Sequence, residues 1–231
     1  MKTIGLVGGT GWVSSVDYYR IINQEINRSL GGLDFARCIL YSLNFGEIFE
    51  CIQRDDREGI YALILDASQK LTRIGADCVL ICANTMHQFA DRLEKEITVP
   101  IIHIATVTAK QIRNRKLSKV GLLGSKETME KDFYKLKLQS EGIETLVPDA
   151  DDREFIDQTI TNELLKEIFK KETKKRFLDI IQKLRNRGAQ GIVLGCTEIP
   201  LLIKDEDVDF PLFNTTLIHS RAAVEFALGS K

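Results

Sequence analysis

Short apolar runs alternate with longer amphipathic stretches along most of the chain. The first run, "TIGLV", precedes "VDYYRIINQEINRSL", whose apolar residues recur at helical spacing, and a second run, "ARCILYSL", follows. Later apolar runs are "CVLIC", "VPIIHI", "KVGLLG", "IETLVP" and "GIVLG", with helical patterns between them. Short apolar strands that alternate with helices are typical of parallel sheets covered by helices on both faces. The pattern therefore predicts an α/β fold.

The second half of the chain resembles the first. "IGLVGGTG" is similar to "VGLLGSKE", "CANT" to "GCTE", and "TVPIIHI" to "DFPLFNT". These matches align Gly5 with Gly121, Ala83 with Cys196, and Pro100 with Pro211, in the same order in both halves. The repeat predicts two similar Rossmann-like lobes, residues 1–103 with 216–231 and residues 104–215. Ligands bind beyond the carboxyl ends of parallel strands, so we expect a pseudo-twofold pair of lobes with the active site in the cleft between them.

The turn at Cys196 carries the first candidate catalytic group. "GIVLG" predicts a buried strand, and "TEIPLLI" predicts a helix with Glu198 early and Pro200 in its first turn, where proline is tolerated. Free amides and the dipole at a helix N-terminus stabilise negative charge. The pKa of Cys196 is therefore expected below its free value of about 8.5, which would make it a nucleophilic or basic thiolate. The alternative is a buried, inert cysteine.

The matching turn of the first half is polar but has no cysteine. Asn84 or Thr85 would cap a helix over "MHQFADRLEKEI", and with free backbone amides these side chains could also hold a carboxylate. Ser125 in "LGSKET" could likewise act as a helix cap or hold a carboxylate oxygen. Ala83 occupies the position that aligns with Cys196.

Cofactor motifs are incomplete. "GGTGWVSS" supplies Gly9 and Gly11 of a dinucleotide fingerprint, but Ser14 replaces the third glycine and no acidic residue ends the second strand. No P-loop motif occurs, and His87, His103 and His219 lack the spacing of metal ligands. We therefore expect neither a cofactor nor a metal.

Composition narrows the class of partner. The 32 basic residues are balanced by 33 acidic ones, so charge gives no case for nucleic acid or an anionic membrane. No apolar run is long enough to span a bilayer, and "MKTIGLVGG" is too short for a signal peptide. The five cysteines are an odd number without the spacing of a disulfide scaffold, which suits the reducing cytoplasm. A small molecule is the expected partner.

The motifs "IGLVGGTGW", "ANTMH" and "GCTEIP", in this order on a duplicated chain, resemble the aspartate/glutamate racemase superfamily. The resemblance covers essentially the whole chain and is strongest to the aspartate racemase branch, which includes broad-specificity amino-acid racemases. It implies a homodimeric amino-acid racemase that needs no pyridoxal phosphate. In that scheme one cysteine thiolate removes the α-proton, and a second thiol returns a proton to the opposite face.

Carried over to this chain, the resemblance makes Cys196 the base on the L-enantiomer side and leaves Ala83 in place of the first cysteine. It implies a substrate-binding set in which the two cations are candidate partners of a side-chain carboxylate: Thr10, Ser15, Asn84, Thr85, Ser125, Thr197, Glu198, Lys166 and Arg54. Alanine cannot transfer a proton, so a strict two-thiol racemase is excluded. We expect a slow or L-selective reaction on aspartate or glutamate, with water, Thr85 or a shifted Cys82 as the second proton donor.

Strand alternation argues against Cys82 in that role, since Cys78 and Cys82 should face the same side of the sheet and Ala83 the other. Two further functions remain open. One is a single-cysteine lyase or isomerase of the superfamily, such as a decarboxylase, for which one proton donor suffices. The other is a binding protein that keeps the carboxylate site and has lost the chemistry.

Overall fold

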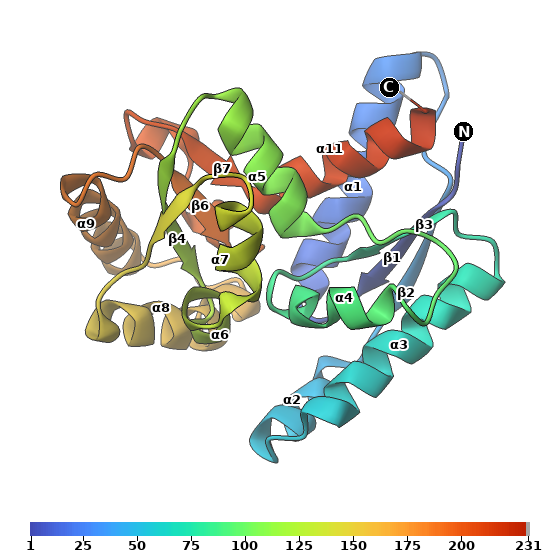
Figure 1. Cartoon of the computed structure of the whole chain (residues 1–231), viewed down its shortest axis with the longest axis horizontal. Coiled ribbons are helices and arrows are strands. Elements are labelled where there is room, and N and C mark those ends of the chain that lie inside the picture. The colour runs from blue at the N-terminus through green and yellow to red at the C-terminus, as the bar shows by residue number, and fades with distance from the viewer. Residues whose placement is uncertain (230–231) are drawn as a thin grey trace. The chain divides into compact units, whose positions relative to one another are not determined.

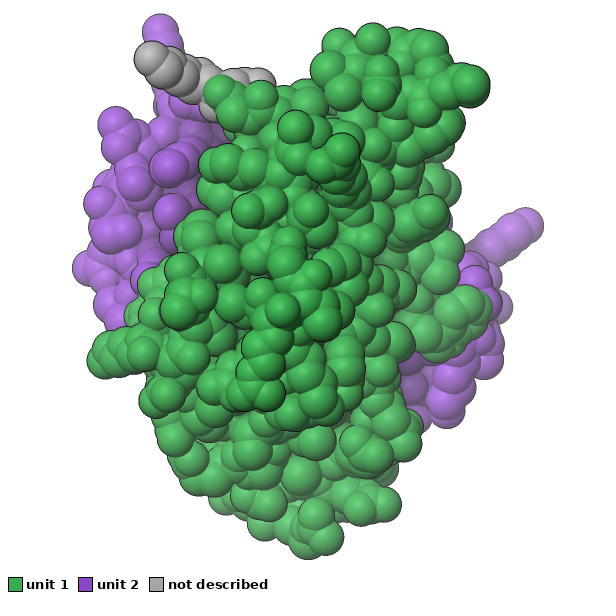
Figure 2. Space-filling model, turned by 90° about the vertical axis from the view of Figure 1, so that its right-hand side faces the viewer, with its two compact units in different colours: residues 1–103, 219–231 green, residues 104–218 purple. Residues whose placement is uncertain are grey.

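The computed structural model describes residues 1–229, which form two compact units (Figure 1; coloured separately in Figure 2). Unit 1 comprises Met1–His103 and the chain from His219 onward, and unit 2 comprises Ile104–Ile218. The sequence placed this second boundary at residue 215, where helix α11 (Thr215–Leu228) begins. The start of α11 is held to unit 2 because Thr215 Oγ1 donates a hydrogen bond to Leu194 O at 2.8 Å.

Unit 1 is built on a parallel sheet with the strand order β2-β1-β3. The strands are β1 (Ile4–Gly8), β2 (Cys38–Ser42) and β3 (Cys78–Ile81). Its other elements are α1 (Trp12–Leu30), α2 (Phe45–Gln53), α3 (Arg57–Arg73), the 3₁₀ helix η1 (Thr85–Phe89) and α4 (Ala90–Leu93). Each connection between paired strands passes through helical segments, as parallel pairing requires.

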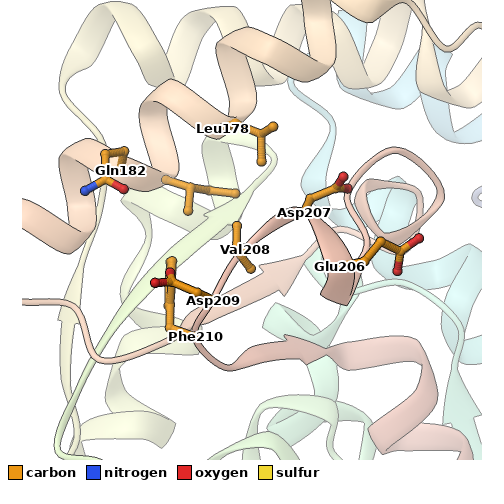
Figure 3. Close-up of a pocket in the computed structure, with 8 residues that line it drawn as sticks. Leu178, Gln182, Glu206, Asp207, Val208, Asp209 and Phe210 are labelled. Atoms are coloured by element: carbon orange, nitrogen blue, oxygen red, sulfur yellow. The ribbon is translucent and has the colours of Figure 1, made fainter.

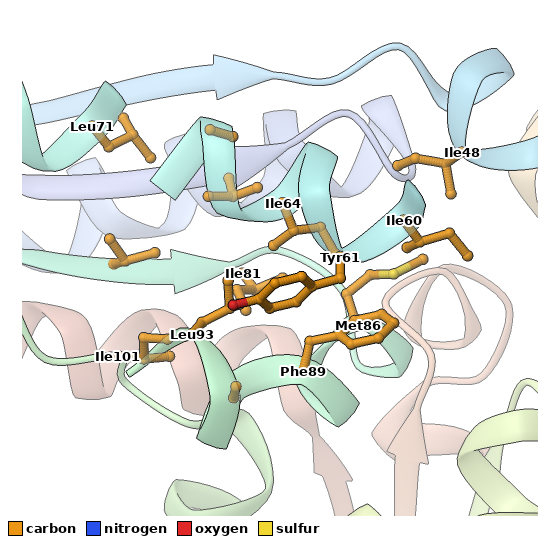
Figure 4. Packing of buried hydrophobic residues seen from close by; sticks show 14 of the residues in the cluster. Ile48, Ile60, Tyr61, Ile64, Leu71, Ile81, Met86, Phe89, Leu93 and Ile101 are labelled. Carbon is orange, nitrogen blue, oxygen red and sulfur yellow. The ribbon is translucent and has the colours of Figure 1, made fainter. Parts of the chain in front are cut away.

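Alternate residues of β1 and β3 pack on opposite faces of this sheet. One set packs with the buried sides of α1 and α11: Ile4, Leu6, Cys78, Leu80 and Cys82. The other set packs against α2, α3 and η1, as Figure 4 shows for Ile81 beside Tyr61 and Phe89. Helices therefore cover both faces, which confirms the α/β prediction.

Unit 2 contains a second parallel sheet, with the order β5-β4-β6-β7. The strands are β4 (Lys119–Gly124), β5 (Glu144–Leu146), β6 (Ile192–Gly195) and β7 (Leu212–Asn214). The helices are α5 (Ile104–Asn114), α6 (Lys126–Glu130), α7 (Asp132–Gln139), α8 (Ala150–Asn162), η2 (Leu164–Lys166), α9 (Lys171–Asn186), α10 (Ile199–Leu202) and η3 (Asp205–Asp207). Helices α5 and α7 pack in one core cluster, whereas α8 and α9 pack in the other.

The strand register shows that the two units repeat. Gly5 and Gly121 each pair with a residue of the neighbouring strand that lies four positions before Ala83 and Cys196, respectively. Each glycine is required by close packing, since an added Cβ would lie 2.8 or 2.5 Å from the nearest side-chain carbon. Ala83 and Cys196 thus occupy equivalent positions, each just beyond the carboxyl end of its strand.

Three expected elements differ from the structure. Residues 99–104 form no strand, and only Ile101 makes a parallel bridge, to Val79, because α5 already begins at Ile104. The helical stretch that precedes Ile74 is two helices, α2 and α3, separated where Asp55 adopts a φ of 53°. The helix expected over residues 86–97 is also shorter, since η1 and α4 end at Leu93.

Candidate active site

The turn after β1 positions two of the residues that the sequence selected. Thr10 follows β1, and Ser15 lies in the first turn of α1, where its Oγ accepts a hydrogen bond from Gly9 N at 2.9 Å and donates one to Gly11 O at 3.1 Å. Gly9 adopts a φ of 87°, and a Cβ on it would lie 2.1 Å from Leu43 O. Only glycine permits so close a turn. Thr10 and Ser15 are both almost fully buried at this turn.

The turn after β3 carries Ala83, Asn84 and Thr85. Ala83 N donates to Ile81 O at 2.8 Å, so the chain turns immediately after the strand. Ala83 and Thr85 are half-buried, whereas Asn84 is 3% exposed. Cys82 is buried with α1 and α11, on the face of the sheet opposite to Ala83, and burial raises its pKa far above the ordinary value. The structure therefore gives no support to Cys82 as a proton donor.

In unit 2, Cys196 directly follows β6 and is hydrogen-bonded to a carboxylate. Cys196 Sγ donates to Glu198 Oε2 at 3.0 Å, and Thr197 Oγ1 donates to the same oxygen at 2.8 Å. Glu198 is 3% exposed, and its other oxygen, Oε1, has no hydrogen-bond partner within residues 1–229.

The expectation of a lowered thiol pKa is wrong, because the pKa of Cys196 lies well above its ordinary value. Burial is the largest cause, and the negative charge of Glu198 and its hydrogen bond from the thiol raise the pKa further. The N–H groups of Glu198 and Ile199 act in the predicted direction and lower it. Burial and Glu198 outweigh them. The dipole of α10 is also weak, because this helix has only four residues. Cys196 is a thiol with a carboxylate acceptor beside it.

The sequence also selected Ser125, Lys166 and Arg54, which lie on α6, η2 and α2 or at their ends. Ser125 caps α6, and its Oγ accepts from Thr128 N at 3.3 Å. It directly follows β4, whose last residue pairs with the last residue of β6, so Ser125 and Cys196 lie at the same edge of the sheet. Lys166 is exposed at the end of η2, which packs against α10. Arg54 is exposed at the C-terminal end of α2, about 13 Å along the helix axis from the turn after β2.

A surface pocket of about 440 Å³ in unit 2 shares no residue with the Cys196 turn (Figure 3). It is lined by side chains of α9 and of the segment around η3, among them Glu206, Asp207 and Asp209. Lys174 and Arg185 pair with the two aspartates at 2.7 and 2.5 Å, respectively. These ion pairs account for most of the charge at the pocket.

The sequence did not predict that His87, His103 and His219 would meet in unit 1. The centroid of the His87 ring lies 4.8 Å from that of His103 and 5.3 Å from that of His219. Neighbouring positions in the chain gave no signal of this, because His219 is brought in by α11 from the far end of the sequence. Within residues 1–229, no three His, Cys, Asp or Glu side chains are grouped as a metal site requires.

The family model described as Asp/Glu/Hydantoin racemase matches residues 7–223. The chain belongs to the Asp/Glu/hydantoin racemase family. It is therefore placed among the amino-acid racemases, which are isomerases. No helix in the described part of this racemase is both long and apolar enough to cross a membrane.

Three relatives of this racemase are informative. A candidate Asp/Glu racemase from Yersinia pestis has a sequence 42% identical to this chain. Its crystal structure matches with a TM-score of 0.92, and the match covers 99% of this chain and 100% of the other. That of an aspartate racemase homologue from Pyrococcus horikoshii OT3 is 36% identical, with a TM-score of 0.84 and the same coverage. The broad-specificity amino-acid racemase of Bacillus subtilis is 22% identical over 227 residues, 96% of each chain.

Proposed function

We propose that this racemase acts on aspartate, glutamate or both without pyridoxal phosphate, and that Cys196 removes the Cα proton of the L-enantiomer. The hydrogen bond from Cys196 Sγ to Glu198 Oε2 is the observation that carries the proposal, because it supplies a proton acceptor for an otherwise unreactive thiol. A thiol with a raised pKa is a poor base alone. Beside a carboxylate that can take its proton, it can become one.

In the proposed reaction, every proton that leaves a group is accounted for. The thiol proton moves from Sγ to Oε2, which leaves a thiolate and a carboxylic acid, so the pair keeps one negative charge. The thiolate takes the Cα proton, and the electrons of the C–H bond remain on the substrate as a carbanion conjugated with its carboxylate. A donor on the opposite face returns a proton to Cα. Glu198 then releases its proton to solvent, and the base left by the donor takes one from solvent, which restores the starting state of the site.

The missing thiol makes the reaction one-sided. The family scheme draws the second proton from the turn equivalent to that of Cys196, where this chain has Ala83. Water or the hydroxyl of Thr85 is the donor that remains, and both are much weaker acids than a thiol. Deprotonation of the D-enantiomer would need a base at the same position. We therefore propose an L-selective enzyme whose inversion is slow compared with its Cα exchange.

Uncharged polar groups are proposed to hold the substrate carboxylates, and Ser15 and Thr197 would exchange their present hydrogen bonds to Gly11 O and Glu198 Oε2 for bonds to the substrate. These polar groups lie at the strand ends of each unit: Thr10, Ser15, Asn84 and Thr85 in unit 1, with Ser125 and Thr197 in unit 2. Glu198 Oε1, buried without a partner in the described chain, is suited to accept a hydrogen bond from the ammonium group of an amino acid. Lys166 is retained as the candidate cation because η2 packs against α10. The position of Arg54 gives it no such support.

We also propose that the enzyme is a cytoplasmic homodimer. Trp12, Val16 and Tyr19 recur at helical spacing along α1, and each is more than half exposed, so they offer an apolar surface to a second copy. The five cysteines are all free, which accords with a reducing compartment. Light scattering of the purified protein would test the dimer, and a monomeric mass at micromolar concentration would contradict it.

The test of function is Cα exchange. L- and D-aspartate and L- and D-glutamate are each incubated with the protein in D₂O and followed by proton NMR and chiral chromatography. We expect deuterium at Cα of an L-isomer, lost in Cys196→Ala and retained in Cys38→Ala, a matched control at a half-buried cysteine of β2. Exchange that survives Cys196→Ala would refute the role of Cys196. Carbon dioxide release would indicate a decarboxylase, and tight binding without exchange a binding protein.

A further inference from the structure

The three histidines of unit 1 form one buried cluster. His87, His103 and His219 are 2%, 9% and 0% exposed. The His87 ring lies 4.8 Å from that of His103 and 5.3 Å from that of His219, centroid to centroid. Tyr18 of α1 completes the cluster, with its ring edge-on to that of His219. The cluster adjoins the turn at Ala83, because His87 lies in η1, the helix that this turn begins.

Hydrogen bonds fix which nitrogen of two of these rings carries the proton. His87 Nδ1 lies 2.8 Å from Ala83 O, and a carbonyl only accepts, so Nδ1 is the protonated nitrogen. His219 Nε2 donates to Ile102 O at 2.5 Å, which leaves Nδ1 to accept from Tyr18 OH at 2.7 Å. Burial lowers the pKa of His87 to about 4, so its ring is neutral near pH 7.

The bond from His87 fixes one peptide unit of the turn. Ala83 C=O and Asn84 N–H belong to the same planar trans peptide and point in opposite directions. Holding the carbonyl toward His87 therefore directs the N–H of Asn84 away from the histidine cluster. On the other side of residue 83, Ala83 N donates to Ile81 O at 2.8 Å. Residue 83 is thus held by hydrogen bonds on both sides.

The surroundings of Nε2, the second ring nitrogen of His87, bear on the role of this residue. His87 Nε2 is buried and has no hydrogen-bond partner in the part of the chain that the structure describes. Burial of an unsatisfied nitrogen is unfavourable, so the ring is not the best residue for packing alone. Its Nδ1–H contacts the turn where the family scheme places the second proton transfer.

We propose that His87 is a positioning residue for the reaction: through the Ala83 carbonyl it sets the orientation of the 83–84 peptide toward the substrate. The inference rests on the proposed function. Asparagine can test it, because its Nδ2 occupies nearly the place of histidine Nδ1, whereas leucine fills similar space without a donor. Tyr18→Phe is the matched control, since it disturbs the cluster without touching the turn.

The experiment compares His87→Leu, His87→Asn and Tyr18→Phe in the Cα exchange assay with L-aspartate and L-glutamate. We expect His87→Leu to lower kcat about 100-fold, as a displaced reacting group does, with KM changed much less. His87→Asn should recover most of that loss. Tyr18→Phe should lower the melting temperature and leave kcat within about threefold of the wild type, since no reacting group moves.

An unchanged kcat in His87→Leu, or equal losses in the leucine and asparagine variants, would overturn the proposal. Nitrogen-15 NMR of the wild-type histidines gives a readout independent of activity, because it reports directly which nitrogen of His87 is protonated. Protonation at Nε2 would also overturn it. If the wild type shows no exchange while the Nδ1–H tautomer is observed, the proposed function fails and the geometry of the turn stands.

Discussion

The unfolding free energy should fall with acidification because His87 is neutral in the folded chain. Burial lowers its pKa from 6.5 to about 4, and hydrogen bonds to backbone carbonyls only partly oppose this. Between these two pH values the unfolded chain binds a proton that the folded chain does not. The histidine therefore contributes stability that is complete above pH 6.5 and is lost as the pH falls toward 4.

The pKa difference of about 2.5 corresponds to about 3 kcal/mol, since each pKa unit is worth about 1.4 kcal/mol. His87 is 2% exposed, so solvent screens this effect little. Burial and the neighbouring His87 also lower the pKa of His219, and its contribution has the same sign. A domain of ordinary stability unfolds at a cost of about 5–15 kcal/mol, so the loss should be easy to measure.

Urea unfolding followed by far-UV circular dichroism, in a series from about pH 7 to about pH 4, measures the effect. Fluorescence is less suitable because the single tryptophan, Trp12, is 60% exposed. The variant His87→Leu should lose about 3 kcal/mol less than the wild type over this range, whereas carboxylate titration affects both equally. Equal losses in the two proteins would refute the reasoning.

Three further predictions follow from the sites and the packing. Ala83→Cys should raise inversion of D-aspartate about 10²–10⁴-fold, measured by chiral chromatography, and Ala83→Ser should not. Glu198→Gln should lower the pKa of Cys196, because it removes a neighbouring negative charge. Iodoacetamide should then label the thiol at lower pH while Cα exchange slows, and an unchanged pH dependence of labelling would contradict this. Gly121→Ala places a Cβ 2.5 Å from Ile192 Cδ1 and should destabilise unit 2 by about 1–3 kcal/mol in calorimetry.

Sequence reasoning succeeded where short-range patterns decide the structure. Short apolar runs predicted strands β1 to β6, although the run at residues 99–104 forms no strand and β7 was not predicted. The repeated motifs predicted that Ala83 and Cys196 hold equivalent positions, which the register confirms. Strand parity also predicted correctly that Cys82 and Ala83 face opposite sides of the sheet. These inferences need only the two-residue period of a strand and the position of the turn that follows it.

Sequence reasoning failed for features of the site that depend on contacts between side chains. The sequence places Glu198 two residues after Cys196, but only the folded turn shows the carboxylate accepting from the thiol and raising its pKa. The helix dipole was expected to dominate, yet α10 has only four residues. The histidine cluster was invisible because α11 brings His219 to His87 from the far end of the chain.

In the proposed mechanism, alanine at position 83 in place of the family's first cysteine affects the charge of the site as well as the rate. The Cys196–Glu198 pair carries one negative charge wherever its proton lies, and aspartate or glutamate brings a further net negative charge to the reaction. In the proposed mechanism, a thiolate at position 83 would add another negative charge near the substrate, and like charges repel. On the proposed mechanism, alanine at position 83 avoids that repulsion and also leaves the site without the second acid. The expected signature is that Ala83→Cys raises both the inversion rate and the KM for the dicarboxylic substrate, whereas a thiol that served only as a proton donor would leave KM unchanged.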